Sequence, residues 1–506
     1  MTLLTKLHVD ITEDLGLDKC PYRLHSCRDP RANATKVCWI LQLNPYLTHV
    51  TITELALKDT RDVRLLTTSI FELKSLQHLS VSGIFILQSA PRLGPTIFFS
   101  CPSCLQTLTL KLVGSFAFWE GASSHNYYRL PPESKDSWEK GDEECGLTTT
   151  PYRKEPLTRM TSLDLKGMEE AFSEQDFLLM LEHCPNLCDI RIPDIRNVGD
   201  TFLLAEMIAG SCPKLTNLTY RDHCEGGTDG YLIARVMGAL PPQQVKRLIC
   251  GDRPFNIRNP DAATIFQKHS STLQTLSLGR CEDVPSKAIQ MVLTQCRGLE
   301  IFETRWAGQR GDLCIDLGDA IEFPWACTRM RTLRLTVAVP DEPLYRHIGE
   351  EPYYMRPPPT TLSAAEQEQF DQLEVLYRQI GELVEIQTLE LSAVFYDPND
   401  RRPFSFRTGA NTFPGMLSTG NHRSGRPGYL HHLGGLTKLR ELAGSVSAET
   451  GETKVTMGLI EAHWMNEHWP VLQCARFFRS QSNITNSFKW LQNQRDGSNP
   501  LSLSWN

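Results

Sequence analysis

Hydrophobic residues recur along this chain in a short phrase with the skeleton LxxLxL, and the phrase returns at a nearly constant interval. From Ser173 to Leu278 the central apolar residues of successive copies lie at positions 190, 218, 248 and 276, in steps of 28, 30 and 28 residues. Such a period is typical of a solenoid, in which each repeat is too small to bury its apolar face except against its neighbours. The pattern therefore predicts an α/β repeat array.

Further copies of the phrase continue the array toward both ends of the chain. In each copy the last apolar residues alternate with polar ones, which is the pattern of a β-strand with one buried face. We therefore expect a strand at each copy. The additional copies run over residues 4–9, 47–52, 76–81, 105–110, 160–165, 299–302, 330–335, 386–391, 439–442 and 472–475, and residues 501–505 predict a last strand.

The segments between the copies show apolar residues at helical spacing, so helices are expected there. Three of them begin after a residue that can cap free backbone N–H groups, namely Ser173, Asp200 and Ser286. Short helices are also expected over residues 36–44 and around residues 488–491.

The first copy begins at Leu4, and a terminal repeat without a cap leaves an apolar face and a strand edge open. Two explanations stay open. Either a segment upstream is missing from this sequence, or the loop over residues 10–36 folds back as the cap.

Three segments interrupt the period, so we expect one solenoid with irregular insertions. Charge and proline dominate the first insertion, a composition that buries little and predicts a surface loop. The second combines a Pro- and Tyr-rich loop with a helix opened by the capping box Ser363-Ala-Ala-Glu366, and the third, rich in Gly, Pro and Arg, predicts a loop. The solenoid spans residues 1–506, the insertions span residues 113–157, 340–385 and 396–435, and residues 479–506 are expected to form a C-terminal cap.

The charges of the chain are nearly balanced, with 52 basic and 59 acidic residues and a net charge of -7. This gives no general electrostatic reason to bind nucleic acid or an anionic membrane. The N-terminus lacks the apolar run of an export signal, and charged residues interrupt every apolar run short of a membrane span. We therefore expect a monomer in the cytoplasm, with the nucleus as the alternative, and neither nucleic acid nor a membrane as a partner.

Several of the sixteen cysteines occupy one phase of the repeat. Each lies three residues before the first apolar residue of a phrase, where a helix is expected to end. A cysteine that recurs with the repeat is most simply a small buried hydrophobic residue, not a disulfide partner or a zinc ligand. The residues in this position are Cys184, Cys212, Cys296 and Cys327.

Motifs for catalysis or cofactor binding are weak in this chain. His463 and His468 are five residues apart, which puts them on different sides of a helix. Cys101 and Cys104 have CxxC spacing, but no second pair of zinc ligands stands at a matching spacing. Neither a phosphate-binding lysine loop nor a GxSxG motif is present. We expect no enzyme activity, no catalytic residue, no cofactor and no metal.

Polar side chains alternate with the buried leucines and must face the other side of the sheet. Arginine recurs among them on successive strands, which lie about 4.8 Å apart, so these arginines would form a ladder on one face. Such a ladder suits carboxylate or phosphate, and Trp306 suits an interface anchor, which predicts a protein substrate, acidic or phosphorylated. The alternative is a solvated face with arginine and acidic residues paired across strands. The positions that face away from the buried leucines begin with Asp164 and Lys166. The candidate partner-binding residues at the later positions are Arg191, Asp194, Arg221, Asp222, Asp252, Arg280, Glu303, Arg305, Trp306 and Arg334.

The phrase CPxLxxLxL, together with Leu273-Gln-Thr-Leu-Ser-Leu-Gly-Arg-Cys281, resembles the cysteine-containing leucine-rich repeats of F-box proteins. The plan with long insertions is similar to fungal F-box/leucine-rich-repeat proteins. The resemblance implies a ribonuclease-inhibitor-like α/β solenoid: a curved horseshoe with a parallel sheet on its concave face and helices on its convex face. It also implies the substrate-recognition arm of an SCF-type ubiquitin ligase.

This sequence departs from that family in one place, because no F-box opening precedes Leu4. A Skp1-type adaptor is therefore an expected partner only if an F-box lies upstream, and no F-box residue carries over to this chain. Two alternatives remain for the function: a free-standing interaction scaffold and, with less support from the repeat subtype, a regulator of small GTPases.

Overall fold

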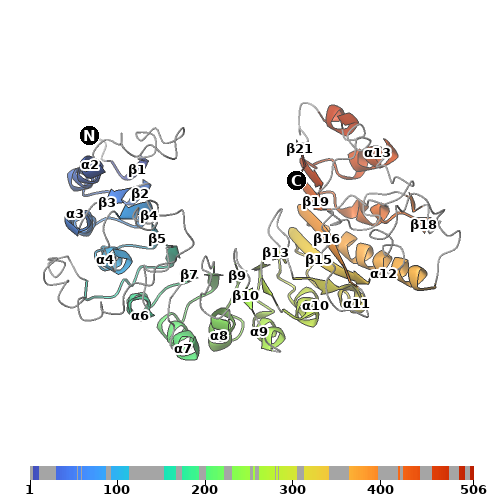
Figure 1. The fold of residues 1–506 in the computed structure, drawn as a ribbon, viewed down its shortest axis with the longest axis horizontal. Helices are drawn as coiled ribbons and strands as arrows, with labels where there is room; N and C mark the ends of the chain where they lie inside the picture. The colour runs from blue at the N-terminus through green and yellow to red at the C-terminus, as the bar shows by residue number, and fades with distance from the viewer. Residues whose placement is uncertain are drawn as a thin grey trace, which may run out of the picture. The chain divides into compact units, whose positions relative to one another are not determined.

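A computed structural model gives the fold of the chain (Figure 1). The chain divides into two compact units, unit 1 (Met1–Gln244) and unit 2 (Val245–Asn506). The structure describes residues 4–10, 30–53, 55–57, 60–86, 93–112, 153–166, 174–192, 201–220, 231–250, 255–256, 261–279, 281–282, 284–304, 313–340, 364–396, 420–421, 426–444, 459–477, 489–495 and 502–505.

Unit 1 is built on a parallel sheet with helices along one of its faces (Figure 1). Its strands pair in chain order: β1 (Lys6–Asp10), β2 (His49–Thr53), β4 (His78–Ile86), β5 (Thr107–Leu112), β6 (Ser162–Lys166), β7 (Asp189–Ile192) and β8 (Asn217–Tyr220). The short β3 (Ala56–Leu57) pairs with the end of β4. The helices are α2 (Pro30–Leu43), α3 (Thr60–Phe71), α4 (Leu93–Phe99), α6 (Glu174–Glu182), α7 (Thr201–Ser211) and α8 (Tyr231–Ala239).

Unit 2 repeats the same plan. Its parallel strands pair in the order β9 (Arg247–Cys250), β11 (Thr275–Leu278), β13 (Ile301–Glu303), β15 (Thr332–Pro340), β16 (Thr388–Tyr396), β19 (Glu441–Gly444), β20 (Cys474–Phe477) and β21 (Ser502–Trp505). Short pairs add β14 (Ile315–Asp316) to β15, β10 (Phe255–Asn256) to β12 (Cys281–Glu282), and β17 (Gly420–Asn421) to β18 (Arg426–Pro427). The helices are α9 (Asp261–His269), α10 (Ser286–Gln295), α11 (Leu317–Glu322), α12 (Ala364–Gly381), the 3-10 helix η8 (Tyr429–Gly435) and α13 (Leu459–His468).

The apolar residues of the phrase form the core between strands and helices. In the copy around β7, Leu187, Ile190 and Ile192 are all 0% exposed. One backbone carbonyl at each corner accepts two consecutive N–H groups of the next repeat: Cys188 N and Asp189 N lie 2.9 and 3.0 Å from Thr161 O. Because this pair of hydrogen bonds to one carbonyl oxygen recurs from repeat to repeat, each strand is held in register with the previous one.

Each repeat thus contributes a strand, a corner and a helical segment, and neighbouring repeats bury one another's leucines. This is an α/β leucine-rich-repeat solenoid with a parallel sheet, as the period predicted. The expected strands are confirmed at every copy of the phrase, including the last one at β21.

The recurring cysteines are core residues, as their phase indicated. Cys184, Cys212, Cys296 and Cys327 are unbridged and 0% exposed. Burial raises the pKa of Cys212, Cys296 and Cys327 to about 12 and raises that of Cys184 as well, because an apolar environment disfavours the thiolate.

The structure corrects two boundaries. Residues 30–36, assigned to a loop, are the first turns of α2, which starts at Pro30 because proline fits the first turn of a helix. Residues 429–435, assigned to the third insertion loop, form η8, which replaces the α-helix of that repeat and buries Tyr429, Leu430 and Leu433. Residues 113–152, 341–363, 397–419 and 422–425 of the insertions lie outside the described residues.

The C-terminal segment is fixed to the last repeats by one arginine. Residues 489–494 are helical, and the following Arg495 is 7% exposed. Its guanidinium donates hydrogen bonds of 2.8 to 3.1 Å to three carbonyl oxygens, those of Met465, Trp469 and Leu472. A cation at the carbonyl-rich end of α13 is favourable.

Candidate functional site

The candidate site is the polar face, which we define as the sheet face turned away from the helices. Strand pairing aligns its side chains into rows that run across neighbouring strands. In unit 1 the middle row holds His8, Thr51, Ser80, Thr109, Asp164, Arg191 and Thr219. In unit 2 it holds Ile249, Ser277, Glu303, Arg334, Glu390 and Ala443.

Arg191 of β7 is paired with Asp164 on the neighbouring strand β6. The Nη1 atom lies 2.7 Å from Oδ1 and 2.8 Å from Oδ2 of the carboxylate, and both side chains are about a quarter exposed or less. The Nε atom of Arg191 is buried without a hydrogen-bond partner. This arginine is therefore neutralised by its neighbour, yet it keeps one unused donor.

Arg334 of β15 lies between carboxylates from both neighbouring strands. Its Nη1 atom donates to Oε1 of Glu303 at 2.8 Å, and its Nε atom is 3.3 Å from Oε2 of Glu390. The Nε contact is an ion pair whose geometry does not make a hydrogen bond. Glu390 is only 3% exposed, so two acidic groups and one guanidinium occupy a largely desolvated part of the face.

Two hydroxyl groups near Arg334 are also buried without a hydrogen-bond partner. These are Ser277 Oγ, in the same row on β11, and Thr336 Oγ1, two residues further along β15. Both residues are 2% exposed. Unsatisfied polar groups are rare in protein interiors, so this part of the polar face holds donors and acceptors that remain unused.

Histidine occupies the row next to the middle row in unit 1. His49 of β2 and His78 of β4 pair in register, and their rings stack with centroids 4.2 Å apart and planes 27° apart. Lys6 aligns with His49 on β1, and Thr107 aligns with His78 on β5. The sequence held a signal for this pair, because a histidine precedes the central apolar residue of two successive phrases, 29 positions apart.

The structure brings Arg191, Glu303 and Arg334 onto the polar face and pairs the two arginines with acidic residues. The cross-strand pairing that the sequence left as an alternative is therefore present at both described arginines. The binding role of these residues stays a prediction. Asp194, Arg221, Asp222, Asp252, Arg280, Arg305 and Trp306 lie outside the described residues.

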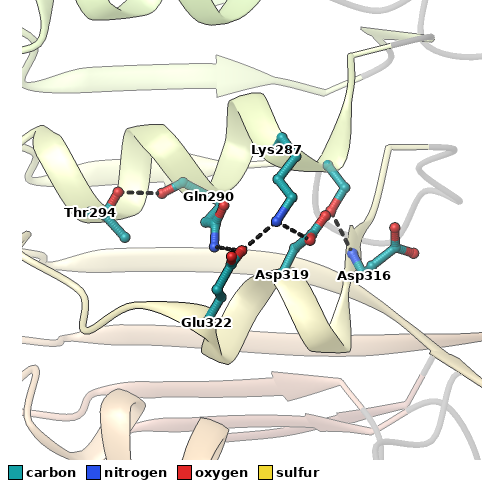
Figure 2. A network of polar contacts seen from close by, with 7 residues as sticks. Lys287, Gln290, Thr294, Asp316, Asp319 and Glu322 are labelled. Carbon is teal, nitrogen blue, oxygen red and sulfur yellow. Dashed lines mark hydrogen bonds and ion pairs between the residues drawn. The ribbon is translucent and has the colours of Figure 1, made fainter.

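A second polar network lies on the helices of unit 2 and links α10 to α11 (Figure 2). Lys287 bridges Asp319 at 2.7 Å and Glu322, and Gln290 donates to Glu322 at 2.8 Å. The hydrogen bond to Asp319 and then that to Glu322 raise the pKa of Lys287, while the bond from Lys287 lowers that of Glu322. The network joins the helices of consecutive repeats and has a structural explanation.

The weak motifs also have structural explanations. His463 packs on Trp490 and His468 stacks on Trp464, with ring centroids 4.0 and 4.2 Å apart. Cys104 donates to the carbonyls of Lys74 and Leu76 of the previous repeat. Among the described residues, no group of three or more His, Cys, Asp or Glu side chains is arranged to hold a metal ion. No helix within the described ranges combines the length and the apolar composition that a membrane span requires.

Comparisons with known proteins identify similar solved structures. No family model and no curated protein matches the chain. The plant peptide hormone receptor RGFR1 in complex with RGF2 is 12% identical over 87% of this chain, with a TM-score of 0.30. The leucine-rich-repeat-containing protein LegL7 from Legionella pneumophila is 10% identical over 75% of this chain and 91% of its own, with a TM-score of 0.34.

A third similar structure is the Drosophila Toll–Spatzle complex, 10% identical over 87% of this chain, with a TM-score of 0.27. The chain spans less than half of the length of the plant receptor and of the Drosophila protein, at 45% and 42%. At these identities the likeness concerns the repeat fold alone.

Proposed function

We propose that this chain is a protein-interaction module that holds a partner protein on its polar face. The observation that carries the proposal is the alignment of polar side chains into in-register rows, each anchored by buried leucines on the opposite side of the strand. Because the strands are rigid and evenly spaced, such rows present hydrogen-bonding and charged groups at fixed positions, which suits recognition of an extended surface.

The partner chemistry differs between the two units. In unit 2, Glu303 and Glu390 share the single guanidinium of Arg334, which favours a basic or neutral group of the partner there. In unit 1, Asp164 already neutralises Arg191, so an acidic or phosphorylated partner fits better at the end of the face that carries Lys6, His49 and His78.

For the finer assignment we propose the substrate-recognition arm of an SCF-type ubiquitin ligase, which rests on the resemblance of the repeats. The alternative is a free-standing interaction scaffold. A regulator of small GTPases is a second alternative, which has less support from the repeat subtype. The assignment requires that the full gene product contain an F-box and bind a Skp1-type adaptor. Co-purification of that product with Skp1 is the test, and absence of both the F-box and the adaptor would overturn the ligase assignment. The cytoplasmic location and the monomeric state stay predictions.

The protein-binding proposal is tested by blocking the face. Ser80→Trp and Thr109→Trp place bulky uncharged side chains in the middle row without adding a charge beside the Asp164–Arg191 pair, and Glu206→Trp adds the same side chain on the exposed side of α7 as a control. We expect affinity capture and mass spectrometry to find a partner that binds the native chain and the control variant. This partner should not be captured by the two row variants. Equal capture by all variants, with unchanged melting temperatures, would place the partner elsewhere.

A further inference from the structure

His49 and His78 form a stacked pair on the polar face, and hydrogen bonds fix the orientation of at least one ring. Thr48 Oγ1 lies 2.9 Å from the carbonyl oxygen of Thr5, to which it can donate. Thr48 Oγ1 also lies 2.9 Å from Nδ1 of His49. The Thr48 hydroxyl therefore ties the Nδ1 edge of the His49 ring to Thr5, just before β1, and leaves the Nε2 edge without a hydrogen bond to the described residues.

His78 is held in a similar way by the next strand. Its Nδ1 atom lies 2.7 Å from Thr107 Oγ1 on β5. Within the described residues, the Nε2 atoms of His49 and His78 make no hydrogen bond. A protonated imidazole carries a proton on both ring nitrogens, so each protonated ring presents an Nε2–H group as a charged donor.

The surroundings of the pair favour an anion. Lys6 aligns with His49, and Lys111 lies on β5 in the row beyond the middle row. His8 aligns with Thr51 on the same face. The sequences of β1, β2, β4 and β5 contain a single acidic residue, Asp10 at the far end of β1, which pairs with Thr53. Burial, then the positive charges of His78 and Lys6, lower the pKa of His49, so this cation lacks a carboxylate that would stabilise it.

We propose that His49 and His78, together with Lys6, bind an anionic side chain of the partner protein, a carboxylate or a phosphate, and bind it more tightly when the imidazoles are protonated. This inference rests on the proposed protein-binding function and assigns the acidic part of the partner to one end of the face in unit 1. An anion bound at the edges of the two stacked rings supplies the missing counter-charge. Anion binding and histidine protonation are thermodynamically linked. If protonation of the two histidines strengthens binding of the anion, the bound anion must raise the pKa of the histidines to the same extent in free energy.

The test is a pH titration of the histidine rings by NMR, on the full chain with isotope-labelled histidine, in chloride, sulfate or acetate at equal ionic strength. Sulfate represents a phosphate group, because it keeps its double negative charge over the whole pH range of the titration. Acetate represents a side-chain carboxylate. The variants His49→Gln and His78→Gln assign the two resonances, and the exposed His463 on α13 is the internal control. Thr48→Val removes the hydroxyl that fixes His49.

We expect sulfate to raise the pKa of His49 and His78 by about half a unit or more relative to chloride, and to leave His463 unchanged. An effect of acetate as well indicates that a carboxylate suffices, and an effect of sulfate alone indicates a phosphate site. In His49→Gln the shift of His78 should fall, and in Thr48→Val the shift of His49 should fall. Equal behaviour in all three salts, or the same shift at His463, overturns the inference.

The titration needs no partner, so its failure is distinct from that of the proposed function. Without an ion effect, the row variants Ser80→Trp and Thr109→Trp still decide whether the polar face binds protein. If the ion effect is present, capture of the partner should be weaker in the His49→Gln/His78→Gln double variant than in His463→Gln. Equal capture by the two would also overturn the inference.

Discussion

The guanidinium of Arg191 and the carboxylate of Asp164 form a charge pair across two adjacent parallel strands, with Nη1 within 2.8 Å of both oxygens. We expect Arg191→Glu to lower the free energy of unfolding by about 1 kcal/mol, because two carboxylates then face each other across the strands. Chemical denaturation measures the change. Loss of partner binding in this variant alone would therefore mix a structural effect with a recognition effect.

The charge-swapped double variant Asp164→Arg/Arg191→Asp provides the control for this pair. It should recover most of the lost stability, because the pair is restored with opposite polarity. If the double variant is as unstable as the sum of the single variants, the contact does not contribute through charge, and the prediction is wrong.

Arg334 should matter more for stability than Arg191, although both arginines occupy the middle row. Arg334→Met removes the guanidinium next to Glu390, which is 3% exposed, whereas the side chain of Asp164 is 26% exposed. Leaving a buried carboxylate without its cation costs about 3 kcal/mol, against about 1 kcal/mol or less for a pair that is about a quarter exposed. Urea unfolding of Arg334→Met and Arg191→Met side by side tests this, and equal losses would contradict it.

The end of α12 depends on a glycine. A Cβ atom at Gly381 would collide with the carbonyl oxygen of His432 in η8, so the backbone of one segment must move in Gly381→Ala. We expect a loss of about 2 kcal/mol or more, as in other overpacked sites. Gly318→Ala in α11 is the matched control, because nothing lies within 4 Å of its Cβ position. That control should be neutral or slightly stabilising, and similar melting temperatures for both variants would refute the close approach.

The buried cysteines predict alkaline instability. The thiol of Cys212 has a pKa of about 12 in the folded chain, against an ordinary value of 9.0. Between these values the unfolded chain releases a proton that the folded chain keeps, so the free energy of unfolding falls as the pH rises, by up to about 1.4 kcal/mol per pH unit and thiol. Below pH 9 this contribution is fully present.

Unfolding under reducing conditions between about pH 8 and pH 11 measures this slope. Tyrosine and lysine titrate in the same range, so the slope of Cys212→Ala must be subtracted from that of the native chain. The control is the variant Cys188→Ala, which removes a half-buried cysteine from the preceding copy of the phrase. Identical slopes for Cys212→Ala and the native chain would show that the thiol ionises equally in the folded and unfolded states, which would contradict the prediction.

Much of the fold is readable from the sequence because the leucines of each phrase have a single stable arrangement. Leu187, Ile190 and Ile192 are buried only if the phrase forms a strand against its neighbours. The start of α2 at Pro30 escapes this reasoning, because residues 30–36 show no apolar periodicity. The replacement of a helix by η8 also escapes it, because the Gly- and Pro-rich composition around Tyr429 predicts a loop.

The candidate site is less predictable. Sequence reasoning places Arg334 on the polar face, but its contact with Glu390 depends on strand register across 47 intervening residues, 341–387. The stacking of His49 on His78 depends likewise on the alignment of β2 with β4. A single phrase tells which way a side chain faces, and only the assembled sheet tells which side chain lies beside it.

The nine-residue pairing of β15 with β16 has a consequence for folding. The chain between these strands is 47 residues long, whereas 24 residues (193–216) separate β7 from β8, so loop closure costs about 0.6 kcal/mol more. The additional ladder from Leu335 to Pro340 offsets such a small entropic penalty. We therefore expect the slowest amide exchange of unit 2 in β15 and β16, and we expect folding of that unit to begin there and spread to the repeats on either side.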